Sequence, residues 1–185
     1  MKAGVLALQG DFQEHAAMFA ACHATPVEVR TAEQLAGVDV LAIPGGESTT
    51  ISKLARRNEL VEPIRRRAAE GMPVFGTCAG MIVMAREVLD GEPLLELLDA
   101  TVRRNAYGRQ VDSFETDLEV RGVGPVRGVF IRAPVVSRVG DGVEVLAEHD
   151  GTPVLVRQGN LLAAAFHPEI AGDARLHAEL LKMVG

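Results

Sequence analysis

The chain has 185 residues, 48% of them hydrophobic and 4% aromatic, and this size predicts a single domain over residues 1–185. Its 19 Lys and Arg against 25 Asp and Glu give a net charge of −6, which disfavours nucleic acid as a partner. The longest apolar stretches, 3–8 and 161–166, are far shorter than the ~20 residues that cross a bilayer. We therefore expect a cytoplasmic protein without a membrane segment, in which Cys22 and Cys78 are reduced thiols.

Short apolar runs alternate with longer amphipathic ones in the first half of the chain, which is typical of strand and helix units on a parallel sheet. The predicted strands cover residues 3–8, 27–30, 38–43 and 73–76. The predicted helices cover residues 12–22, 49–58, 60–70 and 79–89. The last of these is apolar nearly all round, so we expect it to be buried against the sheet.

The second half of the chain changes to short alternating segments separated by turn residues. Predicted strands and hairpins cover residues 112–120, 126–131, 143–148, 153–157 and 161–166, followed by a last helix over 173–183. The whole pattern predicts one α/β domain with a mostly parallel sheet.

The strongest local signal is the stretch Gly76-Thr77-Cys78-Ala79-Gly80, between the predicted strand 73–76 and the predicted buried helix. Its spacing is that of the nucleophile elbow G-x-S-x-G, with cysteine in the nucleophile's place. Such a turn lifts one side chain out of the sheet and sets it at a helix N-terminus, which favours a thiolate. A small buried cysteine that only packs is the alternative, but it does not account for the glycine spacing.

His167 directly follows the apolar stretch 161–166, at the end of a predicted strand, where open α/β sheets place their sites. Pro168 favours an extended backbone at His167, so residue 169 points the same way. The Glu169 carboxylate is therefore expected to fix the histidine tautomer and leave the other ring nitrogen for Cys78. A simple strand-ending turn is the alternative for these residues taken alone. Surface or helix-packing roles are assigned to His15, His23, His149 and His177.

Acyl transfer also requires hydrogen-bond donors aimed at the developing oxyanion. The backbone N–H of Ala79 is one candidate, and the glycine turn 44–48, with Gly46, offers the second. The alternative is an ordinary turn in which Ser48 caps the next helix. The turn lacks the Gly-Lys-Ser/Thr ending of a phosphate-binding loop.

Two further segments carry candidate binding residues. Residues 103–110 hold three arginines and the only tyrosine, which suits either carboxylate binding or a plain exposed basic loop. The segment 131–134 ends another predicted strand, and we expect it to bring backbone groups and Arg132 near the same pocket.

These motifs resemble those of class I, or triad, glutamine amidotransferases, and among them the glutaminase subunits of pyridoxal 5′-phosphate synthase. The cysteine elbow and the His-Pro-Glu stretch occur in many triad amidotransferases. Four blocks that together are specific to the subfamily lie at 9–10, 46–50, 109–114 and 130–134. The resemblance covers nearly the whole chain, and no motif position departs from it.

The resemblance implies an α/β fold, a flavodoxin-like three-layer sandwich with a mostly parallel central sheet. It implies that Cys78 is the nucleophile and that His167 and Glu169 complete the triad. The residues that it places against glutamine are Gly46, Glu47, Ser48, Arg104, Ile131 and Arg132, and its oxyanion donors are Gly46 and Ala79. It implies neither a metal ion nor a cofactor.

The resemblance also implies a partner. In this family, ammonia from L-glutamine passes to a separate (β/α)₈-barrel synthase subunit in a large hetero-oligomer, which makes pyridoxal phosphate from ribose 5-phosphate and glyceraldehyde 3-phosphate. The glutaminase is poorly active alone, because docking of the synthase reshapes the oxyanion hole. A Gly45–Gly46 peptide that reorients, and a Gln9 at the interface, suit such a switch.

Three other readings stay open on the sequence. Another triad amidotransferase or a γ-glutamyl hydrolase would share Cys78 and His167 but send its ammonia elsewhere. A redox-sensing module would use the elbow cysteine without hydrolysis. A scaffold for a partner enzyme would use neither residue.

Overall fold

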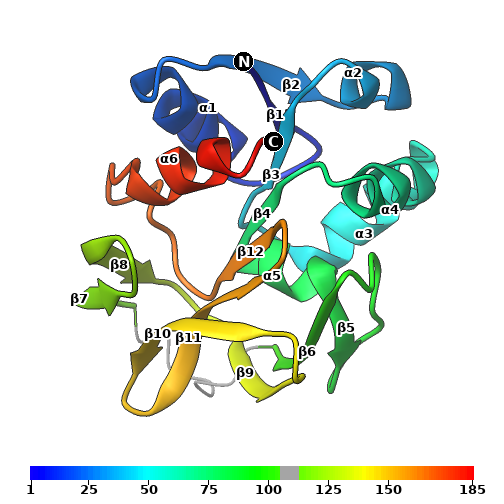
Figure 1. Ribbon diagram of the computed structural model, residues 1–185. Coiled ribbons are helices and arrows are strands. Elements are labelled where there is room, and N and C mark those ends of the chain that lie inside the picture. Colours follow the sequence, from blue (N-terminus) through cyan, green and yellow to red (C-terminus); the bar gives the residue numbers. More distant parts are fainter. Residues whose placement is uncertain (105–112) are drawn as a thin grey trace.

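The computed structural model describes residues 1–104 and 113–185, and its centre is a seven-stranded sheet (Figure 1). In spatial order the strands are β10 (Glu144–His149), β11 (Thr152–Gln158), β12 (Leu161–Ala164), β4 (Val74–Thr77), β3 (Val40–Ile43), β1 (Lys2–Leu6) and β2 (Thr25–Val29). The strands from β12 to β2 pair in parallel, and β10 and β11 add an antiparallel edge. The sheet is therefore mostly parallel, as expected.

Helices cover both faces of this sheet and complete a three-layer sandwich (Figure 1). One face carries α1 (Phe12–Ala21) and α6 (Arg175–Lys182). The other face carries α2 (Ala32–Ala36), α3 (Ser48–Arg57), α4 (Val61–Ala69) and α5 (Ala79–Met84). Every residue of β3, β4 and β12 is buried, because strands covered on both faces have no solvent side.

Two smaller sheets are formed by strands outside the central one. A three-stranded sheet contains β5 (Ala85–Val88), β6 (Leu98–Arg103) and β9 (Val135–Val139). A hairpin pairs β7 (Phe114–Val120) with β8 (Gly124–Phe130). Within the described ranges, no helix is long and apolar enough to cross a membrane.

The predicted helix over 79–89 is wrong in its second half. Helix α5 ends at Met84, and the backbone of Ala85 is already extended, with φ −61° and ψ 144°. Residues Ala85–Val88 form β5, which pairs in parallel with β6. Three further elements have no counterpart among the predicted ones: α2, β6 and β9.

The topology brings the segments of interest to one edge of the sheet. Strands β1, β3, β4 and β12 are parallel neighbours, so their carboxyl ends meet at that edge. The segments that follow them contain Asp11, the turn 44–48, Cys78 and His167. Residues more than a hundred positions apart are thereby placed around one point.

We predict that Asn160→Ala destabilises the fold but leaves the arrangement of residues at the carboxyl edge of the sheet unchanged. The Asn160 side-chain amide donates to Ala68 O at 2.9 Å and to Met72 O at 2.7 Å, tying the end of α4 to the start of β12. Losing both bonds should lower the free energy of unfolding by about 2 kcal/mol in chemical denaturation. The matched change at exposed Asn58 should cost less than about 0.5 kcal/mol. Equal effects would contradict this account.

Candidate active site

The elbow between β4 and α5 holds Cys78 in a strained conformation. Its backbone has φ 49° and ψ −104°, a region that residues with a side chain rarely occupy. The Cys78 N–H donates to Ala164 O at 2.8 Å, which ties the elbow to the neighbouring strand β12. The side chain is buried, so the fold fixes the position of the sulfur.

The two glycines of the elbow are required by close packing. A Cβ at Gly76 would lie 2.6 Å from the carbonyl carbon of Gly80. A Cβ at Gly80 would overlap the carbonyl oxygen of Ile43. Since α5 lies directly on β4 and β3, only glycine fits at these positions, which is the physical reason for the G-x-C-x-G spacing.

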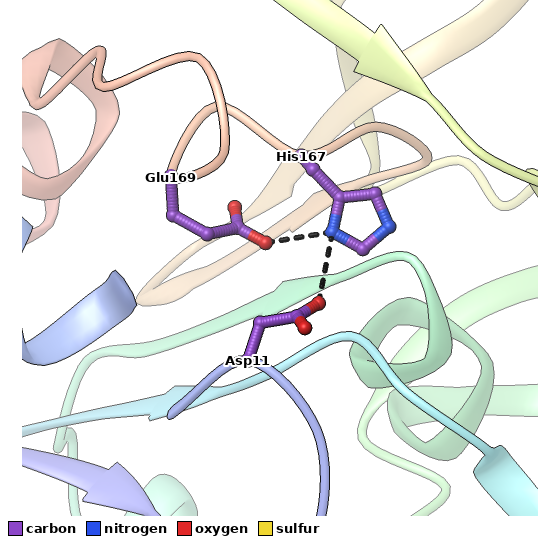
Figure 2. A group of neighbouring side chains, drawn as sticks. All are labelled: Asp11, His167 and Glu169. Carbon is purple, nitrogen blue, oxygen red and sulfur yellow. Dashed lines mark hydrogen bonds and ion pairs between the residues drawn. The ribbon is translucent and has the colours of Figure 1, made fainter. Parts of the chain in front are cut away.

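His167 and Glu169 form a buried hydrogen-bonded pair just beyond β12 (Figure 2). His167 Nδ1 lies 2.7 Å from Glu169 Oε1. The His167 backbone N–H donates to Val129 O at 2.8 Å, which anchors the turn to β8. The carboxylate thus lies on the same side as the ring, as the i, i+2 spacing predicts. The carboxylate accepts a hydrogen bond from Nδ1–H, which leaves Nε2 to face Cys78.

A second carboxylate approaches the same ring nitrogen. Asp11 Oδ2 lies 3.5 Å from His167 Nδ1, so the carboxylates of Asp11 and Glu169 both face this nitrogen (Figure 2). Asp11 stands at the N-cap of α1, and its N–H donates to Gly45 O at 3.3 Å. The one sequence clue to this contact is the position of Asp11 directly after the subfamily block 9–10.

The electrostatics of the pair favour a charged imidazole. Burial opposes the charge, but hydrogen bonds with Cys78 and Glu169 outweigh it and raise the pKa of His167 to about 10. Burial also raises the pKa of the Glu169 carboxyl, and the bond from His167 works against that increase. At neutral pH an imidazolium therefore stands between the sulfur and the carboxylate.

A cleft opens beside the sulfur, and the predicted binding residues meet there. Its lining consists of Gly46, Glu47, Ser48, Cys78, Ala79, Ile82, Arg104, Ile131 and Arg132. Every residue assigned to glutamine or to the oxyanion from the sequence is in that set. An adjoining pocket shares Ser48, Ile82 and Arg104 and continues along α3 to Arg56.

The turn 44–48 shapes one wall of the cleft. Gly46 has φ +143°, which residues with a side chain rarely adopt, and a Cβ there would lie 3.0 Å from the Cα of Gly10, so the position favours glycine. Gln9 Oε1 accepts the Glu47 N–H at 2.7 Å. Glu47 occupies the N-cap of α3 and Ser48 is the first helical residue, so the alternative of a Ser48 cap is wrong.

Arg104 reaches across the cleft mouth to this wall. Its Nη2 lies 3.3 Å from Glu47 Oε1 and 3.2 Å from Thr49 Oγ1. The rest of the arginine-rich segment 103–110 begins at residue 105 and lies outside the described residues. Its predicted role in carboxylate binding therefore stays a prediction.

The helix-packing role assigned to His15 and His177 is incomplete. Both are fully buried, in α1 and α6, and their Nδ1 and Nε2 atoms lie 2.8 Å apart. His15 Nε2 also lies 3.0 Å from Thr77 Oγ1 and 3.6 Å from Glu169 Oε1. The sequence analysis gave no sign of this connection to the site.

Comparison with known proteins decides the family. The model of the SNO glutamine amidotransferase family matches residues 5–185. The chain belongs to this family.

Relatives of this SNO family member agree with the sequence resemblance. The pyridoxal 5′-phosphate synthase subunit PdxT of Frankia alni is 59% identical, covering 98% of this chain and 94% of that protein. The PdxT subunit of Thermus thermophilus is 57% identical, covering 98% and 97%. The crystal structure of a glutamine amidotransferase matches with a TM-score of 0.95 at 53% identity, covering 99% and 98%. The expected amidotransferase-like fold is thereby confirmed.

The strain at Cys78 predicts an order of stability for two variants of this residue. Cys78→Gly relieves the positive φ, whereas Cys78→Ala keeps it. We expect the glycine variant to be the more stable of the two by about 1 kcal/mol in chemical denaturation, despite the greater flexibility of its unfolded chain. A more stable alanine variant would show that the elbow is relaxed.

The His167 environment predicts an unusual titration. By NMR, the His167 ring should lose its proton near pH 10, where an ordinary histidine titrates at about 6.5. Cys78→Ala removes a hydrogen-bond partner of the charged ring, so the midpoint should move down. His167→Gln identifies the resonance. A wild-type midpoint near the ordinary value, or one that Cys78→Ala leaves in place, would contradict the assigned charge state.

Proposed function

We propose that this chain is the glutaminase subunit of a pyridoxal 5′-phosphate synthase. It hydrolyses L-glutamine to L-glutamate and ammonia. The observation that carries the proposal is His167, held between Cys78 and Glu169 beside a cleft, in a chain 59% identical to a PdxT subunit. This is the arrangement that acyl transfer through a thioester requires.

In the proposed reaction the Cys78 thiolate attacks the side-chain amide carbon of glutamine. The tetrahedral intermediate collapses as the His167 imidazolium gives its Nε2 proton to the leaving nitrogen, which departs as ammonia. A thioester with Cys78 is left. His167, now neutral, takes a proton from water, and the resulting hydroxide releases glutamate and restores the thiolate. Glu169 keeps the ring oriented and stabilises its charged form throughout.

The proposed oxyanion donors are the N–H groups of Ala79 and Gly46. Ala79 is the first residue of α5, and N–H groups in the first turn of a helix have no partner within it. Gly45 O accepts from the Asp11 N–H, and in a trans peptide the N–H of the next residue points the opposite way. The Gly46 N–H is thus directed away from α1, and Gly46 lines the cleft with Cys78.

Charged groups at the cleft mouth suit the zwitterionic end of glutamine. We assign the α-carboxylate to the guanidinium groups of Arg104 and Arg132, and the α-ammonium to Glu47. Ser48 and Ile131 complete the contacts to the substrate. Arg104 and Glu47 form an ion pair at 3.3 Å without substrate. In the proposal, each of them binds the opposite charge of glutamine instead.

The ammonia passes, in this proposal, to a (β/α)₈-barrel synthase subunit within a large hetero-oligomer in the cytoplasm. The chain acts as one domain over residues 1–185 and uses neither metal nor cofactor. Docking of the synthase favours the orientation of the Gly45–Gly46 peptide that turns the Gly46 N–H into the cleft, and Gln9, which accepts the Glu47 N–H, transmits the change.

The test is glutamate release by the purified chain, with and without the synthase. We expect strong release only with the synthase, and a loss of at least about a thousandfold in Cys78→Ala. Cys22→Ala is the matched control and should keep full activity. Equal release without the synthase would remove the assignment to pyridoxal phosphate synthesis. Full activity in Cys78→Ala would remove the triad.

A further inference from the structure

Behind Glu169 lies a set of buried polar side chains that the reaction described above does not use. They come from three elements: Thr77 from β4, His15 from α1 and His177 from α6, and none is exposed. Thr77 Oγ1 lies 3.4 Å from Glu169 Oε1. His15 Nε2 lies 3.0 Å from Thr77 Oγ1, and His15 Nδ1 lies 2.8 Å from His177 Nε2. The contacts form an unbroken chain from α6 to the carboxylate.

The direction of donation along these hydrogen bonds follows from the groups at their two ends, Glu169 and His177. An ionised Glu169 is only an acceptor, so the Thr77 hydroxyl donates to it. Thr77 Oγ1 then accepts the Nε2–H of His15, whose bare Nδ1 accepts the Nε2–H of His177. This leaves a bare Nδ1 on His177, which has no partner among the described residues. The reverse direction would bury an N–H there without an acceptor, which costs more than a free lone pair.

Burial keeps both histidines neutral, as this direction requires. Desolvation, together with the nearby His177, holds the pKa of His15 well below its usual range. Desolvation also lowers the pKa of His177 to about 3, although Asp173 acts against it. The ring of His177 is fixed by edge contacts with Phe19 and Phe75, with centroids 5.0 and 5.5 Å away. The donors are therefore held in place and uncharged at neutral pH.

We propose that His177, His15 and Thr77 form a one-way hydrogen-bond relay that holds Glu169 ionised and thereby keeps His167 charged. They are positioning residues, because none of them touches the cleft. This inference rests on the proposed roles of Cys78 and Glu169.

The relay has a physical purpose at this site. Burial and the nearby Asp11 both work against the charge on Glu169, and its Oε2 has no hydrogen-bond partner within the described ranges. The His167 ring offsets part of that cost through Oε1. The relay adds a donor to the same oxygen without adding a positive charge that would compete with His167.

Two pairs of variants separate the relay from packing. Thr77→Val keeps the volume and removes the hydroxyl, whereas Thr77→Ser keeps the hydroxyl and loses a methyl group. His15→Leu removes the ring donor, whereas His15→Gln keeps an amide N–H to face Thr77. All are made with Cys22→Ala, so that Cys78 is the single thiol.

The readout is the rate of Cys78 alkylation by iodoacetamide as a function of pH, with thermal unfolding as the control for folding. Because a hydrogen bond lowers the pH at which Glu169 takes up a proton, its loss should move the acid limb of the profile upward. We expect the midpoint of the acid limb to move up by about 0.5 to 1 pH unit in Thr77→Val and His15→Leu. Thr77→Ser and His15→Gln should stay near the parent, even if Thr77→Ser is the less stable.

An acid limb that Thr77→Val leaves unchanged overturns the relay, as does an equal shift in Thr77→Val and Thr77→Ser. If His15→Leu does not fold, the Thr77 pair decides alone. Imidazole ¹⁵N shifts give a second check: both histidines should carry their proton on Nε2, and a proton on either Nδ1 overturns the assigned direction. Neither measurement uses glutamine or the synthase, so failure of the proposed function would be seen separately.

Discussion

The hydrogen bond between His167 Nδ1 and Glu169 Oε1, 2.7 Å long and buried, is the interaction on which the site depends. It orients the ring so that Nε2 faces Cys78, and it helps keep the ring charged although burial opposes the charge. Such a pair is costly to bury unless its remaining groups are satisfied. The Thr77 hydroxyl meets part of this requirement by donating to Glu169 Oε1, whereas Asp11 faces the same ring nitrogen and opposes the charge on Glu169.

The elbow supplies the other half of the site through sterics. Close contact of α5 with β4 and β3 requires glycine at positions 76 and 80, and it holds Cys78 at a positive φ that isolated residues avoid. Since β4 and β12 are parallel neighbours, the elbow and the His167 turn leave the sheet side by side. The packed central sheet therefore holds both the strained backbone at Cys78 and the buried side chain of His167 in place.

Much of the site and many of the helices and strands could be predicted from local sequence patterns. The spacing of Gly76, Cys78 and Gly80 and the His-Pro-Glu stretch are rules of short range, and the structure has the geometry that they predict. The predicted helix over 79–89 was wrong beyond Met84, because no Gly or Pro separates Ala85–Val88 from the apolar stretch before it, and only its pairing with β6 makes it a strand. Helix α2 did carry a local signal, the capping box of Thr31 and Gln34.

Contacts between residues far apart in the chain could not be predicted from the sequence. His15 and His177 meet across 162 positions, and nothing in either helix pattern distinguishes a packed histidine from one that donates toward Glu169. Asp11 was equally hidden, because its approach to His167 depends on how β1 and β12 are placed in the sheet. Burial and tautomer are properties of the assembled core, so they become readable only in three dimensions.

The central claim is that Cys78 forms a covalent bond with the substrate. Its most direct test is rapid acid quenching of the protein during turnover of glutamine in the presence of the synthase subunit, followed by mass spectrometry of its peptides. The account predicts a mass increase of one glutamyl group on the peptide that carries Cys78, and none on the peptide with Cys22. Steady glutamate formation with no adduct on Cys78 at any quench time, under conditions that preserve thioesters, would contradict it.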